Sequence, residues 1–203
     1  YVIERHYPEL SPDSPVALLR AVATRQARLV AQWQLVGFIH GVMNTDNMLV
    51  SGETIDYGPC AFMNEYDPET VFSSIDRRGR YAFRNQPGIA NWNLCRFAEA
   101  LLLLDDEQGA MQTQIQDVID EFPDILHDAY AEGMGAKLGL GEFRDEDWGL
   151  LTDLLQMMHE QETDMTLTFR RLSERVDPDF AGRSVADVFE LPDAFDDWLE
   201  RWS

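Results

Sequence analysis

The sequence predicts a mainly α-helical domain with one small β-hairpin in its N-terminal third. Between residues 16 and 36, apolar residues recur at three- and four-residue steps, the period of an amphipathic helix. Helical patterns also fill residues 92–203, whereas residues 48–55 form two short apolar runs around a Ser-Gly turn. A chain of 203 residues, 45% of them hydrophobic, can bury one sizeable core, so we expect one domain.

The first third of the chain leads into a loop headed by His40. Residues 1–13 contain two prolines and are interpreted as an ordered connection. Ser14 is a suitable N-cap and Pro15 suits the first helical position, so the first long helix is predicted from there to about Val36. This helix would deliver the chain directly into the His40 loop.

The predicted hairpin follows that loop. Residues 48–50 and 54–55 are too short and too apolar to be helices, and Gly52 between them tolerates a positive φ. Pairing of these runs would return Asp56 to the side of Asn47. The loop at residues 38–59 is therefore where we expect chemistry.

Residues 62–88 are rich in Pro, Gly, Asn and Asp and predict a long ordered loop, which in a compact domain is often functional. Three arginines gather there in an otherwise acidic protein. They could face phosphates or an acidic partner, or pair with nearby carboxylates in solvent. These arginines are Arg77, Arg78 and Arg80.

Three aromatic residues are expected as core anchors under this loop, namely Tyr81, Phe83 and Trp92.

The remainder of the chain predicts helices. Apolar periodicity marks residues 92–102, 115–130 and 148–172, followed by a short acidic helix over 192–202. Pro123 is expected to bend or divide the second of these segments.

The His40 loop has the spacing of a kinase catalytic loop. In that signature an Asn follows the His-Arg-Asp triplet, and the Asp of a later Asp-Phe-Gly binds Mg²⁺. Here Asn47 stands in the place of that Asn, and Asp56 begins an Asp-Tyr-Gly run where the signature has Asp-Phe-Gly. Val42 stands where the signature has its Asp, and valine cannot accept a proton. A simpler alternative is that Asn44, Asp46 and Asn47 only cap local turns.

The runs HGVMNTDNMLV (40–50), TIDYGP (54–59), GRYAFRNQP (79–87) and WNLCRFAEAL (92–101) resemble the selenoprotein O (SelO/YdiU) family of kinase-like protein adenylyltransferases. The resemblance is specific from about Tyr1 to about Leu104. It implies that ATP binds in an orientation flipped relative to a kinase. AMP would then pass to a Ser, Thr or Tyr hydroxyl of a protein substrate.

The resemblance also implies roles for three residues. Asp46 would accept the proton of the hydroxyl, while Asn47 and Asp56 would bind Mg²⁺ or Mn²⁺ together with ATP. Two alternatives remain: a kinase-like phosphotransferase that uses the same ligands, and a non-catalytic pseudokinase module that only binds nucleotide. Val42 favours the second alternative and Asp46 opposes it.

The position of the only lysine predicts that a nucleotide-gripping lobe is missing. A kinase-like site takes a phosphate-binding Lys and a Gly-rich loop from an N-terminal lobe that precedes the catalytic loop. Here the only lysine, Lys137, comes long after the His40 loop, and the first glycine, Gly37, comes just before it. We therefore expect residues 1–203 to be a kinase-like C-terminal lobe, inactive by itself. Residues 38–59 would form its catalytic and metal loops, and residues 92–203 its helical region.

The charge excludes two kinds of partner. With 37 acidic and 16 basic residues the formal charge is −21, which disfavours nucleic acid and anionic membrane surfaces. Cys60 and Cys95 show no paired spacing, which favours a reducing compartment. We expect a cytoplasmic protein if it is bacterial, or a mitochondrial one if eukaryotic.

Overall fold

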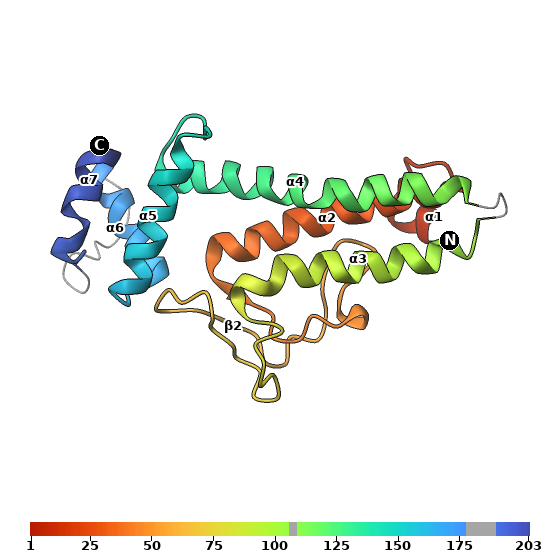
Figure 1. The fold of residues 1–203 in the computed structure, drawn as a ribbon, viewed down its shortest axis with the longest axis horizontal. Helices are drawn as coiled ribbons and strands as arrows, with labels where there is room; N and C mark the ends of the chain where they lie inside the picture. Colours follow the sequence, from red (N-terminus) through yellow and green to blue (C-terminus); the bar gives the residue numbers. More distant parts are fainter. Residues whose placement is uncertain (106–108, 178–189) are drawn as a thin grey trace.

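The structure is a computed structural model, and it describes residues 1–105, 109–177 and 190–203. The helices are α1 (Val2–His6), α2 (Pro15–Val36), α3 (Gln86–Leu102), α4 (Ala110–Leu138), α5 (Asp147–Glu160), α6 (Met165–Val176) and α7 (Asp196–Trp202). The long helices α2, α3 and α4 lie side by side, and the shorter helices α5, α6 and α7 gather at one end of the molecule (Figure 1). The mainly α-helical prediction is therefore confirmed, and in the described ranges no helix is long and apolar enough to cross a bilayer.

The α2 helix forms as its sequence predicts. It begins at Pro15 after Ser14 and ends at Gly37, whose φ of 70° terminates the helix in a left-handed conformation. A Cβ at Gly37 would also lie 2.9 Å from the Met165 sulfur. Both the positive φ and this close approach therefore favour glycine at this position. The chain then enters the loop region that lies beneath α2 and α3 in Figure 1.

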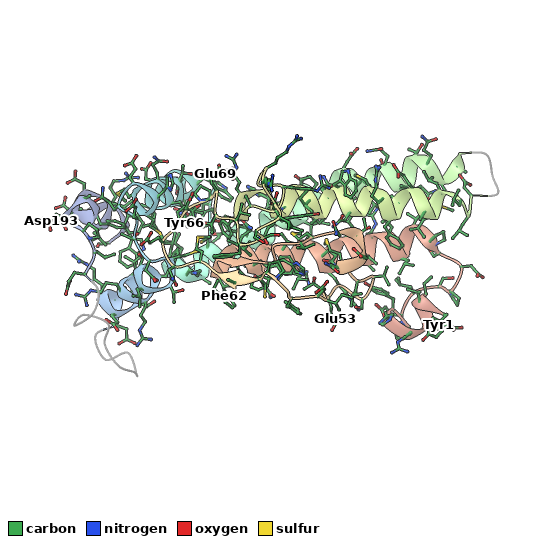
Figure 2. The ribbon with its side chains drawn as sticks, turned by 90° about the horizontal axis from the view of Figure 1, so that it is seen from below. Tyr1, Glu53, Phe62, Tyr66, Glu69 and Asp193 are labelled. Atoms are coloured by element: carbon green, nitrogen blue, oxygen red, sulfur yellow. The ribbon has the colours of Figure 1, made fainter. Side chains whose placement is uncertain are left out.

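The sheet differs from the predicted hairpin. Strand β1 (Phe38–Ile39) pairs antiparallel with β2 (Ala61–Phe62), whereas residues 48–55 contribute one isolated bridge between Met48 and Thr54. A two-residue strand shows no alternation, so periodicity could not reveal this pairing. In Figure 2, the labelled Phe62 and Tyr66 lie nearer to the C-terminal helices than Glu53 does.

Two apolar cores occupy the described part of the molecule. The first lies between α2, α3 and α4 and includes Val30, Leu94 and Phe122. The second joins the C-terminal end of α4 to α5, α6 and α7 around Leu154 and Trp198.

Lys137, the only lysine of the chain, connects α4 to both α2 and α6. Its ammonium donates a hydrogen bond to the Leu35 carbonyl and lies 4.0 Å from the centre of the Phe169 ring. Burial lowers the pKa of Lys137 to about 8. This lysine is therefore a structural connection between helices.

Several predicted boundaries were wrong. The expected connection at residues 1–13 contains the short helix α1, and α3 begins at Gln86, where Pro87 suits the first turn, six residues before the expected start. Pro123 does not divide α4. The segment 148–172 is split between α5 and α6 at residues 161–164, where Glu162 has a φ of 50°. Parts of the expected helical region, residues 106–108 and 178–189, lie outside the described residues.

Candidate functional site

The loops at residues 40–47 and 54–59 are joined through their backbones. The Ile55 N–H donates to the Asn47 carbonyl at 3.1 Å, and the Leu49 N–H donates to the Glu53 carbonyl at 2.9 Å. Asp56 therefore follows directly after a residue that is bonded to Asn47. This is the juxtaposition that the predicted hairpin required, although only one residue pair forms a regular bridge.

Gly41 permits a second close approach between the loops. Its φ is 84°, and a Cβ at this position would lie 2.9 Å from Cγ of Pro59. Most side chains would therefore be both strained and obstructed there. The glycine after His40 and the proline after the Asp-Tyr-Gly run thus pack as one unit.

His40 is fully buried and braces both loops. Its Nε2 lies 3.0 Å from the Ile55 carbonyl and 2.8 Å from the Thr54 hydroxyl, and Nδ1 accepts the Val42 N–H at 3.3 Å. These partners suit a neutral ring with its proton on Nε2. Burial lowers the His40 pKa, partly opposed by the Ile55 carbonyl and Asp56.

Asn47 is buried at the end of a short 3₁₀ turn, η1 (Thr45–Asn47). Its Nδ2 donates to the Val42 carbonyl at 2.9 Å. The side-chain amide is thereby oriented, and its Oδ1 remains as the group that could meet a cation.

Asp46 and Asp56 differ from Asn47 in being exposed. Asp46 is the middle residue of the η1 turn. Asp56 has a φ of 58°, which is unusual outside glycine and is often found where function constrains the backbone. Both carboxylates are thus open to a ligand.

The donor set fits a hard divalent cation only in part. Asn47 Oδ1 and the Asp56 carboxylate are two oxygen ligands of the type that Mg²⁺ accepts, and phosphates and water commonly supply the others. Within the described ranges, no group of three His, Cys, Asp or Glu side chains could hold a metal by itself. The site therefore fits a cation that arrives with a nucleotide better than a resident metal.

Three buried amides support the loops, and the sequence analysis missed them. Gln86 accepts the His40 N–H at 3.0 Å and donates to the Phe38 carbonyl at 2.9 Å. Asn93 donates to the Met43 carbonyl at 3.0 Å, and Gln26 donates to the Leu49 carbonyl at 2.8 Å. A polar residue on the apolar face of a predicted helix was the available signal for Gln26 and Asn93.

The aromatic residues near the arginine-rich loop were predicted with mixed success. Phe83 is buried as expected and Tyr81 is half-buried, but Trp92 is 42% exposed, so its prediction as a core anchor was wrong. The Arg80 guanidinium lies 4.9 Å from the centre of the Trp92 ring, and that of Arg96 lies 5.1 Å away. Cation–π contacts of this kind stabilise an aromatic ring at the surface.

Comparison with known proteins gives a consistent result over the whole chain. The model of the family described as protein adenylyltransferase SelO matches residues 1–203. Proteins named protein nucleotidyltransferase YdiU are 52% identical in Rhizobium meliloti (strain 1021), 54% in Bradyrhizobium diazoefficiens and 52% in Halalkalibacterium halodurans. Each of these alignments covers 100% of this chain, but only 42%, 42% and 40% of the respective relative. The chain thus spans less than half the length of these relatives.

Proposed function

The chain belongs to the SelO family of protein adenylyltransferases, and we propose that its protein transfers AMP from ATP to Ser, Thr or Tyr hydroxyls of other proteins. The observation that supports this most is the backbone bond between Ile55 and Asn47, which brings the Asp46-Asn47 turn against the segment of Asp56. A base and two cation ligands would then lie within one small site, in which Asp46 and Asp56 are exposed and Asn47 is buried.

Asp46 is the proposed proton acceptor. As the hydroxyl oxygen of the substrate bonds to the α-phosphorus, its proton passes to the Asp46 carboxylate. The bond between the α-phosphorus and the bridging oxygen breaks, and pyrophosphate leaves. A positioned base of this kind contributes roughly two to four orders of magnitude in rate. Because Val42 has no acidic group, Asp46 is the candidate base nearest to Asn47 in this loop.

Asn47 Oδ1 and the Asp56 carboxylate would hold Mg²⁺ or Mn²⁺. The cation, when bound, offsets the negative charge of the triphosphate and of the leaving pyrophosphate. The protein contributes rigidity: His40 ties the two loops together, and Gln86 fixes the backbone on either side of Ile39.

We also propose that the chain acts as the kinase-like C-terminal lobe of a longer protein, located in the bacterial cytoplasm. The three relatives named above support this, since each is more than twice as long as this chain and comes from a bacterium. This chain by itself should bind Mg-ATP weakly or not at all, since the groups that grip phosphates would lie elsewhere. Calorimetry tests this directly, and low-micromolar affinity of the isolated chain would contradict it.

Labelled ATP tests the proposed reaction. With the complete protein, a metal ion and a protein acceptor, label on the α-phosphate should become attached to the acceptor, and label on the γ-phosphate should not. The reverse result would establish the kinase-like phosphotransferase. Nucleotide binding without transfer of either label would establish the pseudokinase module, the alternative that Val42 favours.

A further inference from the structure

A surface beside the proposed catalytic loop combines arginines with an exposed indole. Arg80 and Arg96 both lie against Trp92, and the Arg80 guanidinium is also 5.7 Å from the centre of the Tyr81 ring. We call this set, Arg80, Tyr81, Trp92 and Arg96, the arginine–tryptophan surface. Exposed tryptophan and arginine are the residue types that most often dominate protein recognition.

The arginine–tryptophan surface is attached to the loop that contains Asp46. The Tyr81 hydroxyl donates to Asn44 Oδ1 at 2.6 Å, two residues before Asp46. The segment of Tyr81 is held by the Asp76 carboxylate, which accepts the backbone N–H of Arg80 at 2.9 Å and the backbone N–H of Tyr81 at 2.7 Å. A ligand on this surface would therefore be held at a defined distance from Asp46.

A cavity of about 450 Å³ adjoins the same surface. Trp92 and Arg96 line it on α3, and Thr45 lines it from the residue before Asp46. Its other walls are mostly apolar and include Met48 and Phe97. The cavity is large enough for an apolar side chain of a docked segment and opens beside the proposed base.

The charge of this surface contrasts with that of the whole protein. The formal charge is −21, yet in the described ranges no ion pair is found for Arg80 or for its exposed neighbours Arg77 and Arg78. Arg96 pairs with Glu99 at 2.6 Å, but both side chains are about half exposed. Exposed pairs contribute little, so a ligand carboxylate can replace Glu99.

We propose that the arginine–tryptophan surface selects protein substrates in which the acceptor hydroxyl is flanked by acidic residues. Carboxylates of the substrate pair with Arg80 and Arg96, and an apolar side chain of the same segment enters the cavity beside Thr45. The docked segment then presents its hydroxyl to Asp46. This inference rests on the proposed protein-modifying function and names the class of its substrates.

The preference is measurable with two peptides that share one acceptor hydroxyl and one apolar residue, but are flanked by Glu in one and by Gln in the other. The complete protein should modify the Glu peptide with a kcat/KM roughly tenfold higher, because two charge pairs form near a partly desolvated surface. In the double variant Arg80→Gln/Arg96→Gln this preference should fall below about threefold. Added salt should reduce it in the same way.

Arg28→Gln is the matched control, since Arg28 is an exposed arginine of α2 that lines a different cavity. This substitution removes one positive charge, as each substitution of the double variant does, but it should keep the preference for the Glu peptide. The affinity of the double variant for Mg-ATP should also be unchanged. A weakened nucleotide affinity would overturn the proposal by making these arginines phosphate ligands.

Peptide binding separates this inference from the proposed reaction. Quenching of Trp92 fluorescence by the Glu peptide, absent in Trp92→Phe and weakened in the double variant, should occur without any catalysis. Arginine-dependent binding without transfer of AMP would support the docking surface and reject the proposed function. Transfer at equal rates to both peptides, unaffected by the double variant, would reject the docking surface alone.

Discussion

The loop region around His40 and the C-terminal helices α5–α7 bury different kinds of side chain. In the loop region, His40, Asn47, Gln86 and Asn93 are all buried and hydrogen-bonded to backbone. Around α5–α7 the buried side chains are overwhelmingly apolar, as at Trp198. Buried amides specify loop geometry, whereas apolar packing mainly supplies stability. The first region is therefore built to hold a site and the second to support it.

The largest expected effect is that of Asp56→Ala on the metal-dependent reaction. Losing one of the two proposed protein oxygen ligands should abolish the proposed metal-dependent turnover by the complete protein, while thermal unfolding changes little because Asp56 is exposed. Activity and metal dependence would be measured by titration with Mg²⁺ and Mn²⁺. Asp145→Ala, at another exposed loop carboxylate, is the control. An unchanged metal titration would remove Asp56 from the proposed ligand set.

The next effect concerns Asp46, the proposed proton acceptor. Asp46→Asn retains size and hydrogen-bonding reach but removes the base, so transfer should slow by roughly two to four orders of magnitude at unchanged nucleotide affinity. If Asp46 only caps its turn, Asn would serve nearly as well. A rate within about threefold of the parent, at saturating ATP, would therefore make Asp46 a structural residue.

These two predictions concern Asp56, whose position follows from kinase-like spacing, and Asp46, whose role is implied by the family resemblance. The Ser14-Pro15 start and the apolar period of α2 are local signals, and so is the spacing from His40 to Asp56. The contacts of Gln86 with His40 and with Phe38 connect residues 46 and 48 positions apart. No local pattern encodes such a contact. The roles of Asp46, Asn47 and Asp56 stay predictions.

The wrong prediction for Trp92 and the missed division of the segment 148–172 both arise from features that apolar periodicity does not reveal. Trp92 has the side-chain type of a core anchor, but it lies at the surface between Arg80 of the preceding loop and Arg96 one turn later on α3. The division between α5 and α6 occurs where Glu162 adopts a positive φ, a conformation that its sequence gives no reason to expect.

Trp198→Ala tests whether the C-terminal helices act only as support. Trp198 is 2% exposed and donates to the Leu150 carbonyl at 2.8 Å, so its loss should lower the free energy of unfolding by about 3–5 kcal/mol. Activity per folded molecule should be unchanged. Urea unfolding and active-site-normalised rates would be measured together. Trp92→Ala, at an exposed tryptophan, should show the opposite pattern, with little change in stability but weaker peptide binding.

Gln86→Ala should reduce both stability and activity. It leaves the His40 N–H and the Phe38 carbonyl without their partner in a buried place, which costs about 2–4 kcal/mol. The His40 loop would also lose its support from α3, so the rate per folded molecule should fall. Gln156→Ala, which removes an exposed bond within α5, should change neither. Full activity per folded molecule in Gln86→Ala would mean that the buried amides stabilise the fold without positioning the site.

The smallest effect is a pH dependence that His40 confers on stability. Burial lowers its pKa in the folded protein, while in the unfolded chain the value returns to about 6.5. Between these two values the unfolded state binds more protons. The free energy of unfolding should therefore fall as the pH decreases below about 6.5, by at most about 1.4 kcal/mol per pH unit. Above about 6.5 the contribution of His40 should be constant.

Comparison with His40→Gln isolates this contribution, since the carboxylates common to both proteins titrate in both. Urea unfolding at several values between about pH 5 and 7.5 should give a steeper loss of stability in the parent than in the variant. Besides burial, which is the main cause, Nδ1 already accepts the Val42 N–H, so protonation there would place two N–H groups against each other. Parallel curves for the two proteins would show that His40 accepts a proton without disturbing the loops. The bond to Val42 would then not maintain the neutral ring, and the loop region would tolerate a buried charge as readily as its neutral amides.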